Sequence, residues 1–443
     1  MTVRPRWRFL FITLGAVLFV VMGLVHATRV NTDPVRHDQD SYLAYAARLK
    51  ESGFTAIGTR RQMPIYPTLQ ALFITPEASP AAQFERGKRV NIALSFGLSV
   101  LLAWALSRLL PRKEAANLAL VTTFFVIAFR APYVQAEVLV YAILFAQFLV
   151  MCRMWRRPTL PLALVVGGLT ALGFLVKGTA LLGLYVFIGA LVVREGVLLV
   201  RRRGGGVVGA LRNAALGPVA FAAFFAGVYP YAKTSKAIYG AYLYDMSTRY
   251  VMWCDSWEQY CELNRRFGTH DMWKDHPPPE IPTMKSYLAT HSLVDMVTRT
   301  LGGIGEVVGN CLISHGYALF FVSLIGFATA LVVKNPELRK KVLRPRDPAW
   351  VGAFVLPYLL AHLLVLGFYG PLGAGERFSL AMFLPATYAA MRAVAPHATA
   401  DDVVRFGKLR LDWASFQELF FVVVVVQIVF YFAPAMATFY SGG

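Results

Sequence analysis

The sequence predicts an all-α polytopic membrane protein with about eleven transmembrane helices and two long external loops. Two observations on the 443-residue chain support this fold class. Hydrophobic residues make up 57% of the chain and charged residues only 16%, which is unlike a soluble protein. The apolar residues also form runs of about 17 to 25, the length that crosses a hydrocarbon layer about 30 Å thick.

The apolar runs place the transmembrane helices. The first run follows MTVRPRWR, as a secretory signal would, but it has no small-residue cleavage site and is long enough to span. We therefore expect it to remain as the first helix. The predicted spans are 9–28, 91–110, 115–131, 135–152, 159–176, 179–193, 213–231, 310–333, 350–369, 378–394 and 416–437.

The distribution of charge predicts the orientation. The formal net charge is +19, and lysine and arginine collect in alternate connecting loops. Such loops remain cytoplasmic, so we expect a cytoplasmic N-terminus in the cell (inner) membrane. The long loops at 29–90 and 233–310 would then be external, or periplasmic, parts of a single membrane domain at 1–443. The chain has no basic soluble domain, which argues against nucleic acid as a partner.

The four cysteines divide into two pairs. Cys152 and Cys311 lie at or in membrane segments, where cysteine packs as a small apolar residue. Cys254 and Cys261 share the second long loop, in an oxidising compartment if that loop is external. They could form a disulfide or stay as two free thiols about two helical turns apart, and their spacing does not decide.

Two short helices are predicted in the first long loop. Asp40 or Ser41 would cap a helix that runs through YLAYAARLKES and ends at Gly53. A second helix would begin near Pro64 or Pro67. Both segments are amphipathic, so we expect them to lie along the membrane surface.

Several short motifs occur in a suggestive order. HDQDSYLAYAARL and MPIYPTLQALF follow the first span, and RAPYVQAEVLVYAILF, GFLVKGTALLGL and ERFSLAMFLPATY come later. In order and sidedness they resemble the glycosyltransferase C superfamily, especially the protein O-mannosyltransferases and the aminoarabinose transferases that modify lipid A. One departure is that the glutamate of the family's Asp-Glu pair is Gln39 here, with a further acid at Asp40.

This resemblance implies a GT-C-like fold and a function. Such enzymes transfer a sugar from a polyprenyl-phosphate donor to an acceptor on the external face, usually with inversion. The expected partners are this donor, membrane lipids, and a lipid, glycan or protein acceptor. The alternative is a transporter or flippase of lipid-linked sugars without bond chemistry, although the chain lacks the internal symmetry common among transporters.

Two carboxylates are candidates for the general base that accepts the acceptor's proton. Asp38 matches the catalytic aspartate of the family, and a carboxylate can also stabilise an oxocarbenium-like centre. Asp40 is the second candidate. Its other interpretation is a helix cap, because aspartate at that position accepts backbone N–H bonds.

Two cations are candidates for binding the donor phosphate. Lys177 lies at the external end of an apolar hairpin, and Arg377 matches the family's late Arg-aromatic signature. The alternative for Lys177 is a lysine that extends from a helix end toward water. The alternative for Arg377 is a surface pair with Glu376.

The remaining candidates have an acceptor-binding or structural role. Glu137 could hold the acceptor or neutralise Arg130 across a short turn. Arg60 and Arg61 could attract an anionic donor or contact lipid headgroups. We predict no metal site and no certain cofactor, because the histidine and aspartates of HDQD lack the spacing of known metal ligands, which leaves a divalent metal as the minor alternative.

Overall fold

The computed structural model describes residues 5–56, 62–75, 77–201, 206–267, 279–313, 317–343, 350–373 and 376–438. Residues 5–11, 313, 376 and 377 are described by their backbone alone. Helices make up nearly all of the described chain, and the strands β1 (Val404–Phe406) and β2 (Leu409–Leu411) form one antiparallel hairpin. The predicted all-α class is confirmed.

The helices follow the predicted apolar runs closely. The α-helices are α1 (Pro5–Arg29), α2 (Gln39–Glu51), α3 (Ile65–Ala71), α4 (Pro80–Leu109), α5 (Arg112–Val121), α6 (Glu137–Arg156), α7 (Leu160–Val176), α8 (Ala180–Val200), α9 (Gly206–Tyr239), α10 (Met246–Arg249), α11 (Trp257–Phe267), α12 (Met284–Thr290), α13 (Leu293–Ile313), α14 (Tyr317–Lys334), α15 (Pro336–Val342), α16 (Gly352–Tyr369), α17 (Glu376–Val394), α18 (Trp413–Gln427) and α19 (Ala433–Thr438). Short 3-10 or π turns are η1 (Arg36–Asp38), η2 (Thr122–Ile127), η3 (Val251–Trp253), η5 (Gly370–Leu372) and η6 (Ile428–Phe432).

Many of these helices are long and apolar enough to cross a membrane. Within the described residues there are 8 such segments, formed by α1, α4, α6, α8, α9, α14, α16 and the C-terminal run of α18 to α19. Helices α7 and α17 are shorter but also apolar. The polytopic membrane class is therefore confirmed, while the count of eleven spans stays a prediction.

Two predicted boundaries differ from the structure. The span predicted at 310–333 combines the end of α13 with all but the last residue of α14, because both segments are apolar. Helix α4 begins at Pro80, inside the predicted first loop. Ser79 caps it, with the side chain accepting from Ala82 N, and Pro80 occupies the first turn, where its missing N–H has no cost.

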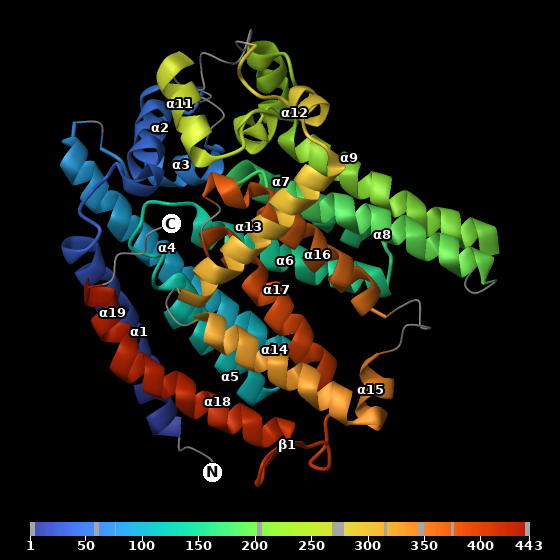
Figure 1. Cartoon of the computed structure of the whole chain (residues 1–443). Coiled ribbons are helices and arrows are strands. Elements are labelled where there is room, and N and C mark those ends of the chain that lie inside the picture. Colours follow the sequence, from blue (N-terminus) through green and yellow to red (C-terminus); the bar gives the residue numbers. More distant parts are fainter. Residues whose placement is uncertain are drawn as a thin grey trace.

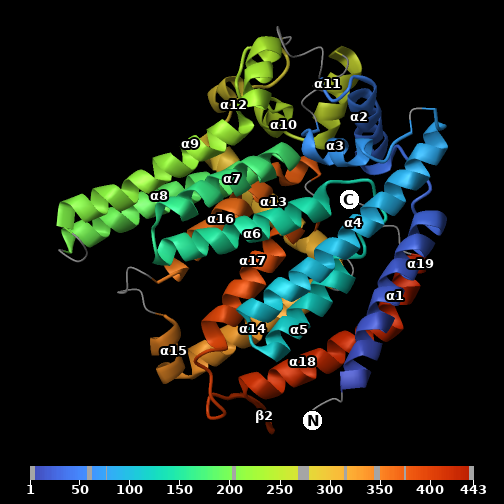
Figure 2. The ribbon, with the colours of Figure 1, turned by 180° about the vertical axis from the view of Figure 1, so that it is seen from behind.

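The two long loops gather at one end of the helical body, which we call the loop face. Figure 1 shows α2, α3, α11 and α12 at this end, and Figure 2 adds α10. The β1–β2 hairpin and α15 lie at the opposite end (Figures 1 and 2). Segments far apart in the sequence therefore meet at the loop face.

A fully buried lysine ties α4 to the start of the first loop. Lys88 is 0% exposed, and its ammonium donates to Ala27 O at 2.5 Å and Asn31 O at 2.9 Å. It also pairs with Glu85 at 2.7 Å. Ala27 lies at the C-terminal end of α1, where the last carbonyls of a helix need partners, and Asn31 follows that end. Lys88 therefore holds the chain in place just before Asp38.

Glycine permits a very close crossing of α13 and α16. A Cβ at Gly303 would lie 1.9 Å from Gly367 O, so the backbones of the two helices are nearly in contact. Adjacent Gly302 has open space, with nothing within 4 Å of the corresponding position. Of these two adjacent glycines, Gly303 is therefore the one that requires the absence of a side chain.

We expect Gly303→Ala to lower the free energy of unfolding by about 1–3 kcal/mol, because backbone cannot move aside as a flexible side chain would. Thermal unfolding of the purified chain in detergent measures this change. Gly302→Ala is the control and should be neutral or slightly stabilising, since alanine favours a helix by about 1 kcal/mol. Equal midpoints for the two variants would contradict the close crossing.

Candidate functional site: an acidic cavity beneath the loop face

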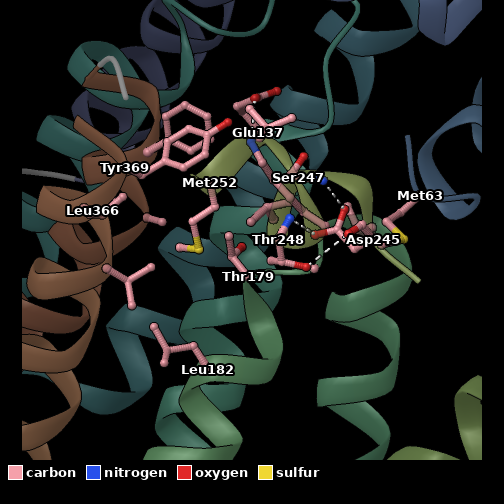
Figure 3. A pocket seen from close by; sticks show the side chains of 18 of the residues that line it. Met63, Glu137, Thr179, Leu182, Asp245, Ser247, Thr248, Met252, Leu366 and Tyr369 are labelled. Carbon is pink, nitrogen blue, oxygen red and sulfur yellow. Dashed lines mark hydrogen bonds and ion pairs between the residues drawn. The ribbon is translucent and has the colours of Figure 1, made fainter. Parts of the chain in front are cut away.

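A cavity of about 990 Å³ lies between the loop face and the membrane helices. Its residues come from the first loop, the start of α6, the α7–α8 turn, the second loop, and the facing parts of α16 and α17. Figure 3 shows part of this lining. The polar and charged lining residues are His37, Asp38, Tyr42, Gln62, Glu137, Tyr141, Lys177, Thr179, Tyr185, Asp245, Ser247, Thr248, Trp257, Tyr260, His362 and Tyr369.

Asp38 reaches the cavity from an unusual backbone conformation. Both His37 (φ 60°) and Asp38 (φ 62°) are left-handed, which is uncommon for residues with a side chain. Asp38 precedes α2 at the capping position, yet its side chain makes no capping hydrogen bond. Such strain costs about 1–3 kcal/mol per residue and persists where surrounding structure imposes it. The conformation directs the carboxylate of Asp38 to the cavity instead of to the helix end.

Gln39 holds that conformation in place. Its side chain is 0% exposed, and its Oε1 accepts from Asn31 Nδ2 and Val134 N, both at 2.9 Å. Its Nε2 donates to Asn31 Oδ1 at 2.9 Å, Arg36 O at 3.1 Å and Asp33 O at 3.3 Å. The amide of Gln39 therefore joins the first loop to the turn before α6.

We expect Gln39→Glu to lower the free energy of unfolding by about 1–3 kcal/mol. The carboxylate of glutamate can still accept the hydrogen bond from Val134 N. It cannot donate to the three oxygens that accept from Gln39 Nε2 in the native chain. Thermal unfolding measures the effect. Gln83→Glu is the control, because Gln83 also donates to a backbone carbonyl, Ala78 O at 3.0 Å, but is only partly buried. An unchanged midpoint for Gln39→Glu would refute this role.

Lys177 and Glu137 form an ion pair in the cavity wall. Lys177 Nζ lies 3.0 Å from Glu137 Oε1, and the side chains are 24% and 5% exposed. The ammonium also lies 4.3 Å from the centre of the Phe378 ring. The α7 helix ends at Val176, so Lys177 projects from the turn before α8. Lys177 therefore lines the cavity as part of an ion pair and is partly exposed there.

The second loop contributes a carboxylate that the sequence motifs do not identify. Asp245 lines the cavity and caps α10, accepting from Thr248 N at 3.2 Å and Ser247 N at 3.4 Å. Surrounding protein raises the pKa of its carboxyl above the ordinary value through desolvation. The only sequence signal was its capping pattern, Asp-Met-Ser-Thr, which predicts a helix start but not a cavity.

Two of the other predicted residues, Asp40 and Arg130, do not line the cavity. Asp40 is exposed in the first turn of α2, where its Oδ1 accepts from Ser41 N at 2.7 Å. Arg130 is 1% exposed, within the turn before α6, and does not line the cavity. Arg60 and Arg61 lie outside the described residues, and so does the side chain of Arg377.

Cys254 and Cys261 are both free thiols in the structure, as are Cys152 and Cys311. Burial raises the pKa of the Cys254 thiol to about 12, so this group stays protonated at neutral pH. Within the described part of the chain, no three His, Cys, Asp or Glu side chains are arranged to hold a metal ion.

The fold and the cavity define a polytopic helical membrane protein with a cavity lined by several acids and a lysine. No protein-family model matches the chain, and no curated protein matches it. Among solved structures, the crystal structure of ArnT from Cupriavidus metallidurans bound to undecaprenyl phosphate is similar at a TM-score of 0.37 and 15% sequence identity. The similarity covers 89% of this chain and 78% of that one.

Proposed function

We propose that this chain is a membrane glycosyltransferase that takes a sugar from a polyprenyl-phosphate donor. The observation that carries the proposal is that Asp38 and Lys177 line one cavity, although they are far apart in the sequence. A carboxylate can act as a base, and an ammonium can hold a phosphate. The order of the sequence motifs, which resembles the glycosyltransferase C superfamily, supports the same function.

The proposed reaction is an inverting displacement. The acceptor hydroxyl attacks C1 of the sugar, and Asp38 accepts the hydroxyl proton as the new C–O bond forms. The bond between C1 and the phosphate oxygen breaks, and polyprenyl phosphate leaves. Lys177 faces the charge that develops on this leaving group. Arg377 is proposed as a second cation for the donor phosphate, on the sequence motif alone.

An apolar part of the cavity suits the isoprenoid chain of the donor. Leu182 of α8 and Leu366 of α16 line it (Figure 3). Tyr185 also lines it and is 52% exposed, so the cavity reaches the outer surface of α8, where lipid would lie. A donor in the membrane could enter here with its tail in lipid and its phosphate toward Lys177.

We propose that the loop face is external and that the protein lies in the inner membrane. The basic residues of the loops at the opposite end support this orientation. An acceptor, whether lipid, glycan or protein, would approach beneath the two long loops and reach Asp38.

Comparison of lipid and glycan products in a deletion strain and its parent tests the proposed function. Mass spectrometry should show one sugar-bearing product that is lost on deletion and restored by the chain. The purified chain should also form that product from a polyprenyl-phosphate sugar. Translocation of the intact donor with no sugar transferred would instead establish the transport alternative.

A further inference from the structure

One wall of the cavity has no part in the reaction described above. The second loop forms this wall, and its lining residues include Asp245, Ser247 and Thr248 followed by Trp257 and Tyr260. Three of the four residues from Asp245 to Thr248 carry a side-chain oxygen. In Figure 3, Asp245 lies on the right and Leu366 on the left of the labelled residues. The wall therefore combines polar atoms with aromatic rings.

Asp245 has acceptor capacity that the protein does not use up. A carboxylate has about four acceptor positions, and Asp245 accepts from the backbone amides of Ser247 and Thr248 and from the Thr248 side chain. The side chain is only partly buried, because it opens on the cavity. Helix capping thus accounts for part of its hydrogen-bonding capacity and leaves the rest toward the cavity.

Asp245 lies directly against the turn that carries Lys177. A Cβ at Gly178 would be 3.6 Å from Asp245 Oδ2 and 3.8 Å from Met63 Cε. These are ordinary contact distances, so the turn and the carboxylate are direct neighbours. Asp245 and Lys177 therefore belong to adjoining parts of the cavity wall.

An aromatic platform completes the wall. Trp257 is 47% exposed although it lines the cavity, and its ring centre lies 5.0 Å from that of Tyr260. Aromatic faces bind the apolar C–H faces of sugars, while carboxylates and hydroxyls bind the sugar hydroxyls. This combination of groups is the chemistry that carbohydrate recognition requires.

We propose that Asp245, Thr248 and Trp257 form the subsite that recognises the sugar ring of the donor, which rests on the proposed function. The sugar is not anionic, because Asp38 and Asp245 would repel a negative charge in the cavity. Asp245 accepts hydrogen bonds from ring hydroxyls, and the indole of Trp257 supports one face of the ring.

Binding to the purified full-length chain in nanodiscs tests this subsite with two kinds of probe. One is undecaprenyl phosphate, and the other is the same lipid carrying glucose, mannose or arabinose. We expect the native chain to bind at least one of the sugar-bearing lipids about tenfold more tightly than the bare lipid phosphate. That gain in affinity is the quantity attributed to the wall.

Asp245→Asn is the decisive variant, because asparagine caps a helix as well as aspartate and so preserves α10. Asp245→Asn and Trp257→Ala should each remove most of the gain, while binding of bare undecaprenyl phosphate stays unchanged. Glu258→Gln is the matched control, since Glu258 is exposed beside Trp257 and does not line the cavity. It should retain the full gain.

The outcomes separate this subsite from the proposed function. If the native chain binds bare undecaprenyl phosphate but shows no gain with any sugar, the subsite is refuted and the lipid-phosphate site stands. Equal weakening of both probes by Asp245→Asn would also refute it, because the carboxylate would then act on folding or on the phosphate. Failure to bind either probe would overturn the proposed function itself.

Discussion

Asp38→Asn is expected to lower sugar transfer by about 10²- to 10⁴-fold, the usual contribution of a general base. Asparagine cannot accept the acceptor's proton, but it is nearly isosteric with aspartate. It also tolerates a left-handed backbone, as Asp38 requires at φ 62°. Asp38→Ala should abolish transfer too, but it adds backbone strain, so asparagine is the cleaner test.

Each variant is expressed in a deletion strain, and mass spectrometry measures the amount of sugar-bearing product that it restores. The amount of product is normalised to the amount of chain in the membrane. The thermal midpoint of Asp38→Asn should stay near that of the native chain. Asp40→Asn is the matched control, because Asp40 is two residues away but exposed and outside the cavity lining. Native product levels with Asp38→Asn, or a loss confined to Asp40→Asn, would exclude Asp38 as the base.

Lys177→Met is expected to weaken binding of undecaprenyl phosphate by about 10- to 100-fold. A hydrogen bond to a charged group contributes about 1.5–3 kcal/mol, and each 1.4 kcal/mol corresponds to a tenfold change in affinity. The same change leaves Glu137, which is 5% exposed, without the ammonium at 3.0 Å. The free energy of unfolding should therefore also fall, by up to about 3 kcal/mol, since Lys177 is partly exposed.

A double variant distinguishes the binding role of Lys177 from its structural role. Lys177→Met combined with Glu137→Gln removes both charges, so the thermal midpoint should return close to the native value. Binding of undecaprenyl phosphate should stay weak in the double variant, whereas Glu137→Gln alone should retain it. If the double variant binds the lipid as the native chain does, Lys177 serves only as the partner of Glu137.

The extent to which the sequence predicted the structure differs between the helices and the site. Apolar runs locate membrane helices reliably, because backbone groups in lipid must find their hydrogen bonds within the same segment. The end of α13 and the start of α14 were combined into one predicted span because both segments are apolar. The start of α4 at Pro80 did have a local signal, a serine cap followed by proline.

The site was predicted in part. Asp38, Glu137 and Lys177 were selected for their chemistry and motifs, and all three line the cavity. Asp40 has the same chemistry as Asp38 and lies two positions along, yet it is exposed in the first turn of α2. The difference arises from two consecutive left-handed residues. Histidine and aspartate adopt this conformation more often than most residues, but local sequence does not require it of both in succession. Asp245 was missed because nothing in its local sequence indicates that the second loop packs over the turn between α7 and α8.

The sequence by itself determined the helical membrane class and most helix positions, because hydrophobicity and hydrogen bonding in lipid act along each segment separately. It also contained the acids and the lysine that suit sugar transfer. Only the tertiary structure decided that Asp38, Lys177 and Asp245 share one cavity while Asp40 does not. Their proximity depends on how distant helices pack and on how Gln39 and Lys88 anchor the first loop, and neither depends on local sequence alone.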